Sequence, residues 1–168
     1  MKKINKIIVL LTSLFLISCS KTPGNNNNNI GYNVPDLVKF NIEINYYSNA
    51  EQEGSFNISS STLQNMDYTL IRLNEDEVYL GISLEDIFED KNISLHEEAV
   101  IYTTENYENA TTTYNTITDL FILIYQNNDG PWINIPSSSG PAMLGNKNES
   151  DTSTFTKNLT TINCLLTI

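Results

Sequence analysis

Short segments in which apolar and polar side chains alternate, separated by polar turns, constrain the fold of this chain more than any other feature. A period of two with one polar face is typical of a half-buried antiparallel strand. The clearest case is residues 38–47, which predict a strand whose apolar face covers a core. Its apolar side chains are Phe40, Ile42, Ile44 and Tyr46, and Asn41, Glu43 and Asn45 alternate with them.

Further strands are predicted along the rest of the chain. Residues 120–125 form an unbroken apolar run, which is typical of a central strand buried on both faces. Ser48–Asn65 and Pro136–Asp151 are polar and serine-bearing, so we expect long loops there, with a weak strand at Ser55–Ser59 as an alternative. That central strand is predicted to span 118–126. The other predicted strands are 67–73, 99–104, 132–135 and 154–168, and 106–115 is a possible exposed hairpin.

Ser83–Asp90 is the segment with clear helix character. Ser83 is a suitable N-cap, and Asp86 follows three residues later as the acidic half of a capping box. A helix of about two turns is not stable alone, so its apolar side chains must pack on a core. Six or seven strands with one short helix predict an all-β fold, a two-sheet antiparallel β-sandwich, in one domain over residues 35–168.

The N-terminus carries the three parts of an export signal. Lysines at positions 2, 3 and 6 precede an apolar run, residues 7–17, that is too short to span a bilayer as a stable helix. Leu16-Ile17-Ser18-Cys19 then matches the lipobox of bacterial lipoproteins. The resemblance implies cleavage between Ser18 and Cys19, a diacylglycerol on the Cys19 sulfur, and a further acyl chain such as palmitate on the new N-terminus. The alternative is an ordinary secretory signal with a chance cysteine.

Residues 19–34 are predicted to be a flexible tether behind a signal peptide at 1–18. The run Asn25–Asn29 has no apolar side chain, and such a segment cannot bury enough surface to offset its ordering entropy. In many lipoproteins of diderm bacteria, a serine after the lipidated cysteine, here Ser20, favours the outer membrane. We therefore expect a lipid-anchored outer-membrane protein that faces the periplasm.

The charge of the chain limits its partners. Removal of residues 1–18 takes away three lysines and no acidic residue, so the net charge of −11 becomes −14 over the remaining 150 residues. An acidic, lysine-poor surface argues against nucleic acid and against electrostatic docking on anionic lipid, and it suits a basic partner.

Residues that carry enzyme chemistry are sparse, so we expect no enzyme, no cofactor and no metal site. His96 is the single histidine, and neither a nucleophile-elbow motif nor a phosphate-binding glycine loop is present. Cys164 lies in an apolar alternating run and is predicted to be a small buried hydrophobe. The acidic runs 75–77 and 89–90 lack calcium-loop spacing and are predicted to be solvated. Trp132 is predicted to anchor the core or its rim.

Beyond the lipobox, the order of elements from Leu37 to Ile168 resembles that of the TssJ outer-membrane lipoproteins of type VI secretion systems. Lys39–Tyr47 is similar to the first strand of the family, and Leu84–Phe88 to its short helix. The best match is Leu120–Trp132, an apolar strand followed by an acidic turn and a tryptophan. Leu70–Leu73 resembles the second strand, although Asn74 stands where the family often has tyrosine.

The resemblance implies a transthyretin-like sandwich with a scaffold role. Members bind the periplasmic C-terminal region of the inner-membrane protein TssM and help to seat the trans-envelope complex. In the family the loop between the first two strands makes that contact, which by position corresponds to Ser48–Asn65 here. The candidate partner-binding residues are Glu51, Gln52, Glu53 and Phe56. The alternatives are a generic cell-envelope lipoprotein that binds a ligand or host factor and, third, an enzyme or enzyme inhibitor.

Overall fold

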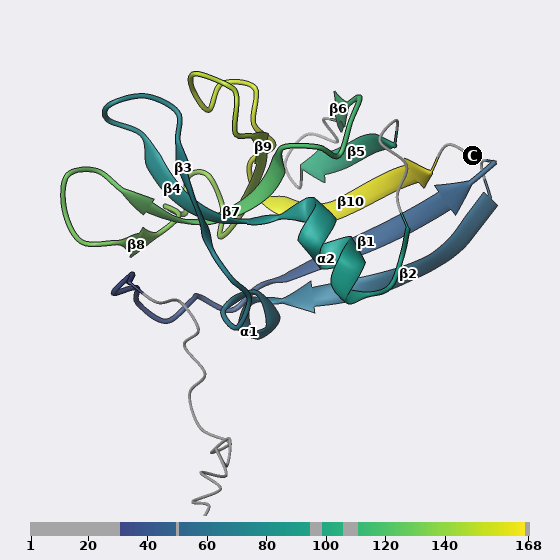
Figure 1. Cartoon of the computed structure of the whole chain (residues 1–168), viewed down its shortest axis with the longest axis horizontal. Coiled ribbons are helices and arrows are strands. Elements are labelled where there is room, and N and C mark those ends of the chain that lie inside the picture. Colours follow the sequence, from purple (N-terminus) through teal and green to yellow (C-terminus); the bar gives the residue numbers. More distant parts are fainter. Residues whose placement is uncertain (1–30, 50, 95–98, 106–110, 167–168) are drawn as a thin grey trace, which may run out of the picture.

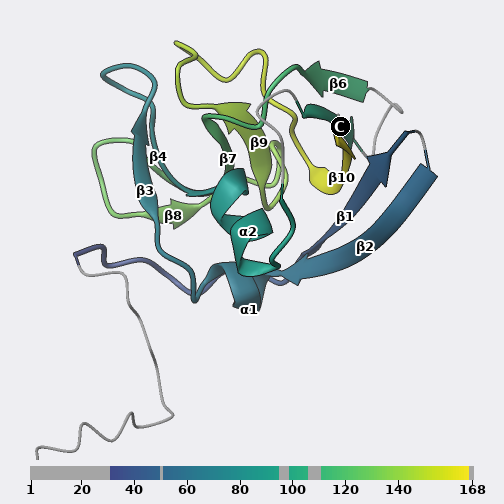
Figure 2. The ribbon, with the colours of Figure 1, turned by 45° about the vertical axis from the view of Figure 1, so that its right-hand side comes forward.

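A computed structural model describes residues 31–49, 51–94, 99–105 and 111–166. Ten strands in these ranges form two sheets, which confirms the all-β sandwich (Figures 1 and 2). The first sheet has the order β2-β1-β10-β5-β6, and the second has the order β3-β4-β7-β8, with β9 also paired to β7. The strands are β1 (Asn41–Ser48), β2 (Glu51–Ser59), β3 (Thr69–Arg72), β4 (Val78–Ser83), β5 (Val100–Glu105), β6 (Thr111–Tyr114), β7 (Leu120–Asn127), β8 (Ile133–Asn134), β9 (Met143–Asn146) and β10 (Leu159–Leu166).

The C-terminal strand β10 closes the first sheet by lying between β1 and β5. It pairs parallel with β1, with Ile44 beside Ile162, and antiparallel with β5. The remaining pairs among the described strands are antiparallel. The first sheet is therefore mixed, because its first and last strands run side by side in the same direction.

Strand β7 is buried on both faces, as its unbroken apolar run predicted. Ile122 and Ile124 belong to the main core between the sheets. Phe121 and Leu123 point to the opposite face, because side chains alternate along a strand, and they belong to a second apolar cluster. That cluster also contains Ile71, Tyr79, Ile135, Met143 and Phe155.

The second cluster is covered by the segment that follows β9. The Phe155 ring lies directly over Gly145, where a Cβ would come within 2.4 Å of the ring. Leu144 and Thr156 exchange two backbone hydrogen bonds of 2.9 Å. Tyr114 Oη donates to the Leu144 carbonyl at 2.9 Å. The prediction of a loop over 136–151 is wrong in this respect, because β9 lies within it and pairs with β7 in the second sheet.

The two helices of the described chain are short, and neither is long and apolar enough to cross a bilayer. Helix α2 (Leu84–Asp90) confirms the predicted helix, with Ser83 as its N-cap and its apolar face buried. Strand β4 runs directly into α2, and the sequence interpretation assigned no strand to Val78–Gly81. Helix α1 (Ser60–Leu63) is a single turn capped by Ser59.

The first described residues are fastened to the edge of the second sheet at β8. Tyr125 Oη donates to the Pro35 carbonyl at 2.7 Å, and Asn134 Nδ2 donates to the Asp36 carbonyl at 3.1 Å. The Tyr32 and Trp132 rings meet edge to face with centroids 5.7 Å apart. Tyr32 and Val34 pack against the core although both lie in the segment expected to be a tether. Trp132 anchors the rim, as expected.

The buried thiol of Cys164 gives a test of the core. Burial raises its pKa to about 12 from an ordinary value of 9.0. The folded state therefore holds the thiol proton more tightly than the unfolded chain. Below pH 9 the resulting stability is fully present, and above it the free energy of unfolding should fall by at most about 1.4 kcal/mol per pH unit until pH 12.

Urea unfolding at a series of pH values checks this expectation. The Cys164→Ala variant should lack this part of the slope between pH 9 and 10. Tyr79, whose pKa is raised to about 12, contributes equally to both proteins, so the difference between their slopes comes from Cys164. Equal slopes for the two proteins in this interval would contradict the burial of an uncharged thiol.

Candidate partner-binding surface

The candidate residues Glu51, Gln52, Glu53 and Phe56 lie on strand β2 and not on a loop. The predicted loop over Ser48–Asn65 is therefore wrong, and the strand extends beyond the alternative at Ser55–Ser59. β2 is the edge strand of the first sheet, and no described strand pairs with its outer side. Polar side chains are usual on such an edge, where charge discourages unwanted pairing. This polar composition is why the segment looks like a loop in the sequence.

A β-bulge lies in the acidic half of β2. Tyr46 pairs with Gly54 and Tyr47 pairs with Gln52, so Glu53 is the extra residue. The Tyr46 side chain lies across Gly54, where a Cβ would come within 2.2 Å of the tyrosine oxygen. Bulges bend a strand and redirect a side chain. Glu51, Gln52 and Glu53 are exposed, and they form the acidic end of β2.

Amide side chains join β2 to the middle of the sheet. Gln52 Nε2 donates to Asn45 Oδ1 at 3.2 Å, and Asn45 Nδ2 donates to Asn163 Oδ1 at 3.1 Å. Farther along, Asn41 Nδ2 donates to Asn57 Oδ1 at 3.1 Å. The first chain of hydrogen bonds crosses β2, β1 and β10, so it orients the acidic end of β2 relative to the rigid centre of the sheet.

Phe56 differs from the other three candidates because it packs inward. Its ring meets Phe88 of α2 edge to face at 5.7 Å and lies 6.4 Å from the ring of Tyr46. Phe56 is half-buried and packs against the main core. The structure therefore brings the acidic residues together at the surface, whereas Phe56 connects β2 to α2 beneath them.

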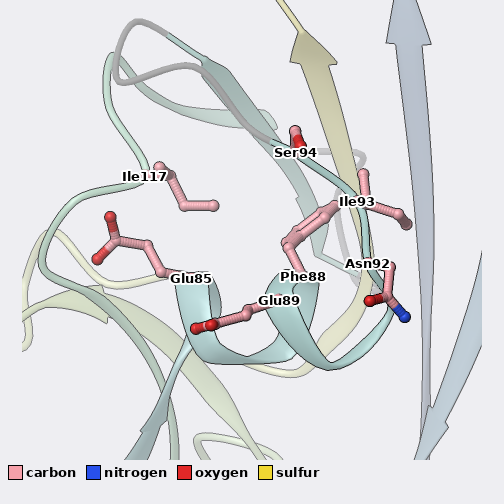
Figure 3. Close-up of a pocket in the computed structure, with 7 residues that line it drawn as sticks. All are labelled: Glu85, Phe88, Glu89, Asn92, Ile93, Ser94 and Ile117. Atoms are coloured by element: carbon pink, nitrogen blue, oxygen red, sulfur yellow. The ribbon is translucent and has the colours of Figure 1, made fainter.

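An open groove of about 490 Å³ lies beside α2 (Figure 3). Phe88 and Ile117 are buried and form its apolar side, together with Ile93. Glu85 and Glu89 are exposed on α2 and make its rim acidic. The spacing of these two glutamates by four residues places them on one helix face, and this was the only signal for the groove in the sequence. Ile117 comes from a distant segment.

Other charged groups serve the fold. Hydrogen bonds from Lys147 and Asn148 lower the pKa of Asp119, and the Lys147 Nζ also lies 5.8 Å from the centroid of the Phe121 ring. Lys91 pairs with Asp90 at 2.8 Å. Asn74 Oδ1 accepts hydrogen bonds from the backbone N–H groups of Asp76 and Glu77, so the acidic run 75–77 forms a turn.

Several predicted features lie outside the described residues. They are the signal peptide and lipobox with Ser18 and Cys19, the tether as far as residue 30, residues 106–110 of the possible hairpin, and His96. In the part of the chain that is described, no three His, Cys, Asp or Glu side chains are arranged to hold a metal ion. No family model matches the chain, and no curated protein matches it in sequence.

Substitutions on β2 should separate its surface from its packing. Phe56→Ala should lower the free energy of unfolding by about 2 kcal/mol, because it removes the ring that contacts Phe88 and leaves a cavity. Glu51→Gln and Glu53→Gln remove exposed charges and should change it by less than about 0.5 kcal/mol. Chemical denaturation of the three variants checks this, and a wild-type stability for Phe56→Ala would contradict the described packing.

Proposed function

We propose that this chain is a lipid-anchored envelope protein whose β-sandwich holds a partner protein. The specific role proposed is that of a TssJ-like component of a type VI secretion trans-envelope complex in the outer membrane. The partner would be the periplasmic region of a TssM-like inner-membrane protein. The lipobox ending at Cys19 and the order of elements from Leu37 to Ile168 support this assignment. The role requires binding and no catalysis.

The observation that carries the proposal is the separation of the two ends of the molecule. The first described residues emerge beside β8, and the acidic end of β2 lies at the other end of the long axis (Figure 1). The same separation is visible after a rotation of 45° (Figure 2). An anchor that enters beside β8 would therefore leave β2 free to meet a protein from the opposite membrane.

Strand β2 suits a protein partner in two ways. An unpaired edge can accept a strand from a partner through backbone hydrogen bonds. Exposed Glu51 and Glu53 would attract a basic surface, and such charge complementarity mainly raises the association rate. Because β2 is already paired with β1 along its whole length, it loses little conformational entropy when a partner binds.

The alternative, a generic envelope lipoprotein that binds a ligand or host factor, is favoured by a different feature. The groove beside α2 combines an apolar side, formed by Phe88 and Ile117, with the acidic rim of Glu85 and Glu89. This groove would suit a cationic ligand with an apolar part. The two candidate functions therefore use different surfaces.

Replacement of Cys19 tests the anchor. Cys19→Ser should remove the protein from the membrane fraction, because the attachment depends on the cysteine sulfur. Cys164→Ala is the matched control, since it removes a cysteine that is buried in the fold. Fractionation, with mass spectrometry of the N-terminal peptide, provides the measurement. An acyl-free Cys19, or unchanged membrane association of Cys19→Ser, would contradict the anchor.

Charge reversal tests the partner surface. Glu51→Lys with Glu53→Lys should slow association with the purified periplasmic region of a TssM-like protein by about ten-fold at low salt. Glu75→Lys with Asp76→Lys is the control, because it reverses the same number of charges in the turn between β3 and β4 (Figure 1). Surface plasmon resonance gives the rates. Equal rates for both double variants would remove β2 from the interface, and loss of binding in variants of Glu85 and Glu89 instead would favour the groove.

A further inference from the structure

The outer face of the first sheet, on the side away from the core, carries a set of amide side chains. Ile42 and Ile44 of β1 point into the core with residues of α2 and β7, so Asn41 and Asn45 point outward, because side chains alternate along a strand. Figure 2 shows α2 and the second sheet on the inner side. The register with β2 and β10 places further amides on the outer face. We call these five amides and one tyrosine the amide face: Asn41, Asn45, Tyr47, Gln52, Asn57 and Asn163.

Hydrogen bonds within the amide face hold its side chains in place. Gln52 Nε2 donates to Asn45 Oδ1 at 3.2 Å, and Asn45 Nδ2 donates to Asn163 Oδ1 at 3.1 Å. Each amide has two N–H donors and an oxygen with two lone pairs, so this network leaves capacity for further hydrogen bonds. Neighbouring strands lie about 4.8 Å apart, so amides on three successive strands cover roughly 10 Å, enough for two linked sugar rings.

The amide face is almost uncharged, although the chain carries 20 acidic residues. Within β1, β10 and residues 55–59 of β2, all of which the structure describes, Glu43 is the one charged residue. The acidic end of β2 borders the face at Gln52. A soluble surface commonly has about 25–35% charged residues. The neutrality of this face therefore indicates a use other than solubility.

The composition of the face argues against two classes of partner. Protein interfaces have a desolvated centre enriched in aromatic residues, Met and Arg, whereas the large apolar side chains of this face are Tyr47 and its neighbour Leu165 on β10. An anionic polymer would be repelled by the net charge of −11. The partner that matches the face is an uncharged polymer that binds through hydrogen bonds.

We propose that the amide face binds an uncharged glycan whose sugars carry N-acetyl groups. An acetamido group has the same C=O acceptor and N–H donor as an asparagine side chain, so it can extend the pairing that joins Asn45 to Asn163. Tyr47 is half-buried on the same face, and its ring can pack against the C–H face of a sugar. This site is separate from the outer edge of β2, so it goes beyond the partner surface proposed above.

NMR of the side-chain NH2 groups tests the proposal. The full chain is purified in a detergent without a sugar headgroup and titrated with chitohexaose, a β-1,4-linked oligomer of N-acetylglucosamine. We expect saturable shifts of the side-chain signals of Asn45, Asn57 and Asn163, and none for Asn74 in the turn between β3 and β4. An absence of shifts at millimolar chitohexaose, or shifts spread over the whole chain, would overturn the proposal.

Variants identify the amides that carry the binding. Asn45→Ala with Asn163→Ala should weaken binding of chitohexaose by about ten-fold, because it removes two hydrogen-bonding groups from the centre of the face. Asn115→Ala with Asn128→Ala is the matched control, since it removes two exposed amides from the connections after β6 and β7. Wild-type affinity in the first double variant would contradict the proposal.

Tyr47→Ala keeps the amide network intact and should also weaken binding, which provides a second test if the first double variant fails to fold in urea-unfolding measurements. Wild-type affinity in this variant would remove the tyrosine from the site.

A second oligosaccharide tests the role of the acetamido group. Cellohexaose has the same linkage with a hydroxyl group in place of each acetamido group, so we expect it to bind at least about ten-fold more weakly than chitohexaose. Equal affinity for the two oligosaccharides would overturn the assignment of an N-acetylated glycan.

Discussion

The burial of β7 on both faces is the constraint on which the rest of this structure depends. A strand with apolar side chains on both faces needs a cover on each side, and the two covers come from different parts of the chain. The first sheet covers Ile122 and Ile124, whereas the segment with Phe155 covers the face with Phe121 and Leu123. Because both covers close on one strand, the sandwich is a rigid support for the strands at its edges.

That support fixes the two ends that the proposed function uses. Tyr125 of β7 donates its hydroxyl proton to the Pro35 carbonyl, so the central strand itself holds the beginning of the domain. Burial and the neighbouring Tyr68 raise the pKa of this hydroxyl, which therefore remains a donor at neutral pH. At the other end, Gln52, Asn45 and Asn163 link the acidic part of β2 to β10. One end thus suits attachment and the other suits contact with a partner.

The sequence predicted the elements whose signal is local and did not predict those that depend on distant partners. Alternation identified β1, the capping serine identified α2, and the unbroken apolar run identified β7. The acidic end of β2 was missed because polar residues on an exposed edge carry no apolar period, although Phe56 and Ile58 gave a weak one. β4 was missed because it passes into α2 without a turn. The parallel pairing of β1 with β10 and the groove beside α2 join residues far apart in the chain, which spacing alone does not reveal. Of the candidate site, the acidic residues were proposed by position and stay a prediction, and their strand and bulge were not predicted.

We propose that the domain is fastened at β8 and meets its partner through β2. Amide hydrogen exchange of the membrane-bound protein, with and without the periplasmic region of the TssM-like protein, tests this most directly, because exchange reports the protection of each backbone segment. We expect the partner to slow exchange in Glu51–Ser59 and to leave residues 31–38 and 120–127 unchanged. Protection confined to α2 and the segment around Ile117, or no protection of β2 at a saturating partner concentration, would contradict the account.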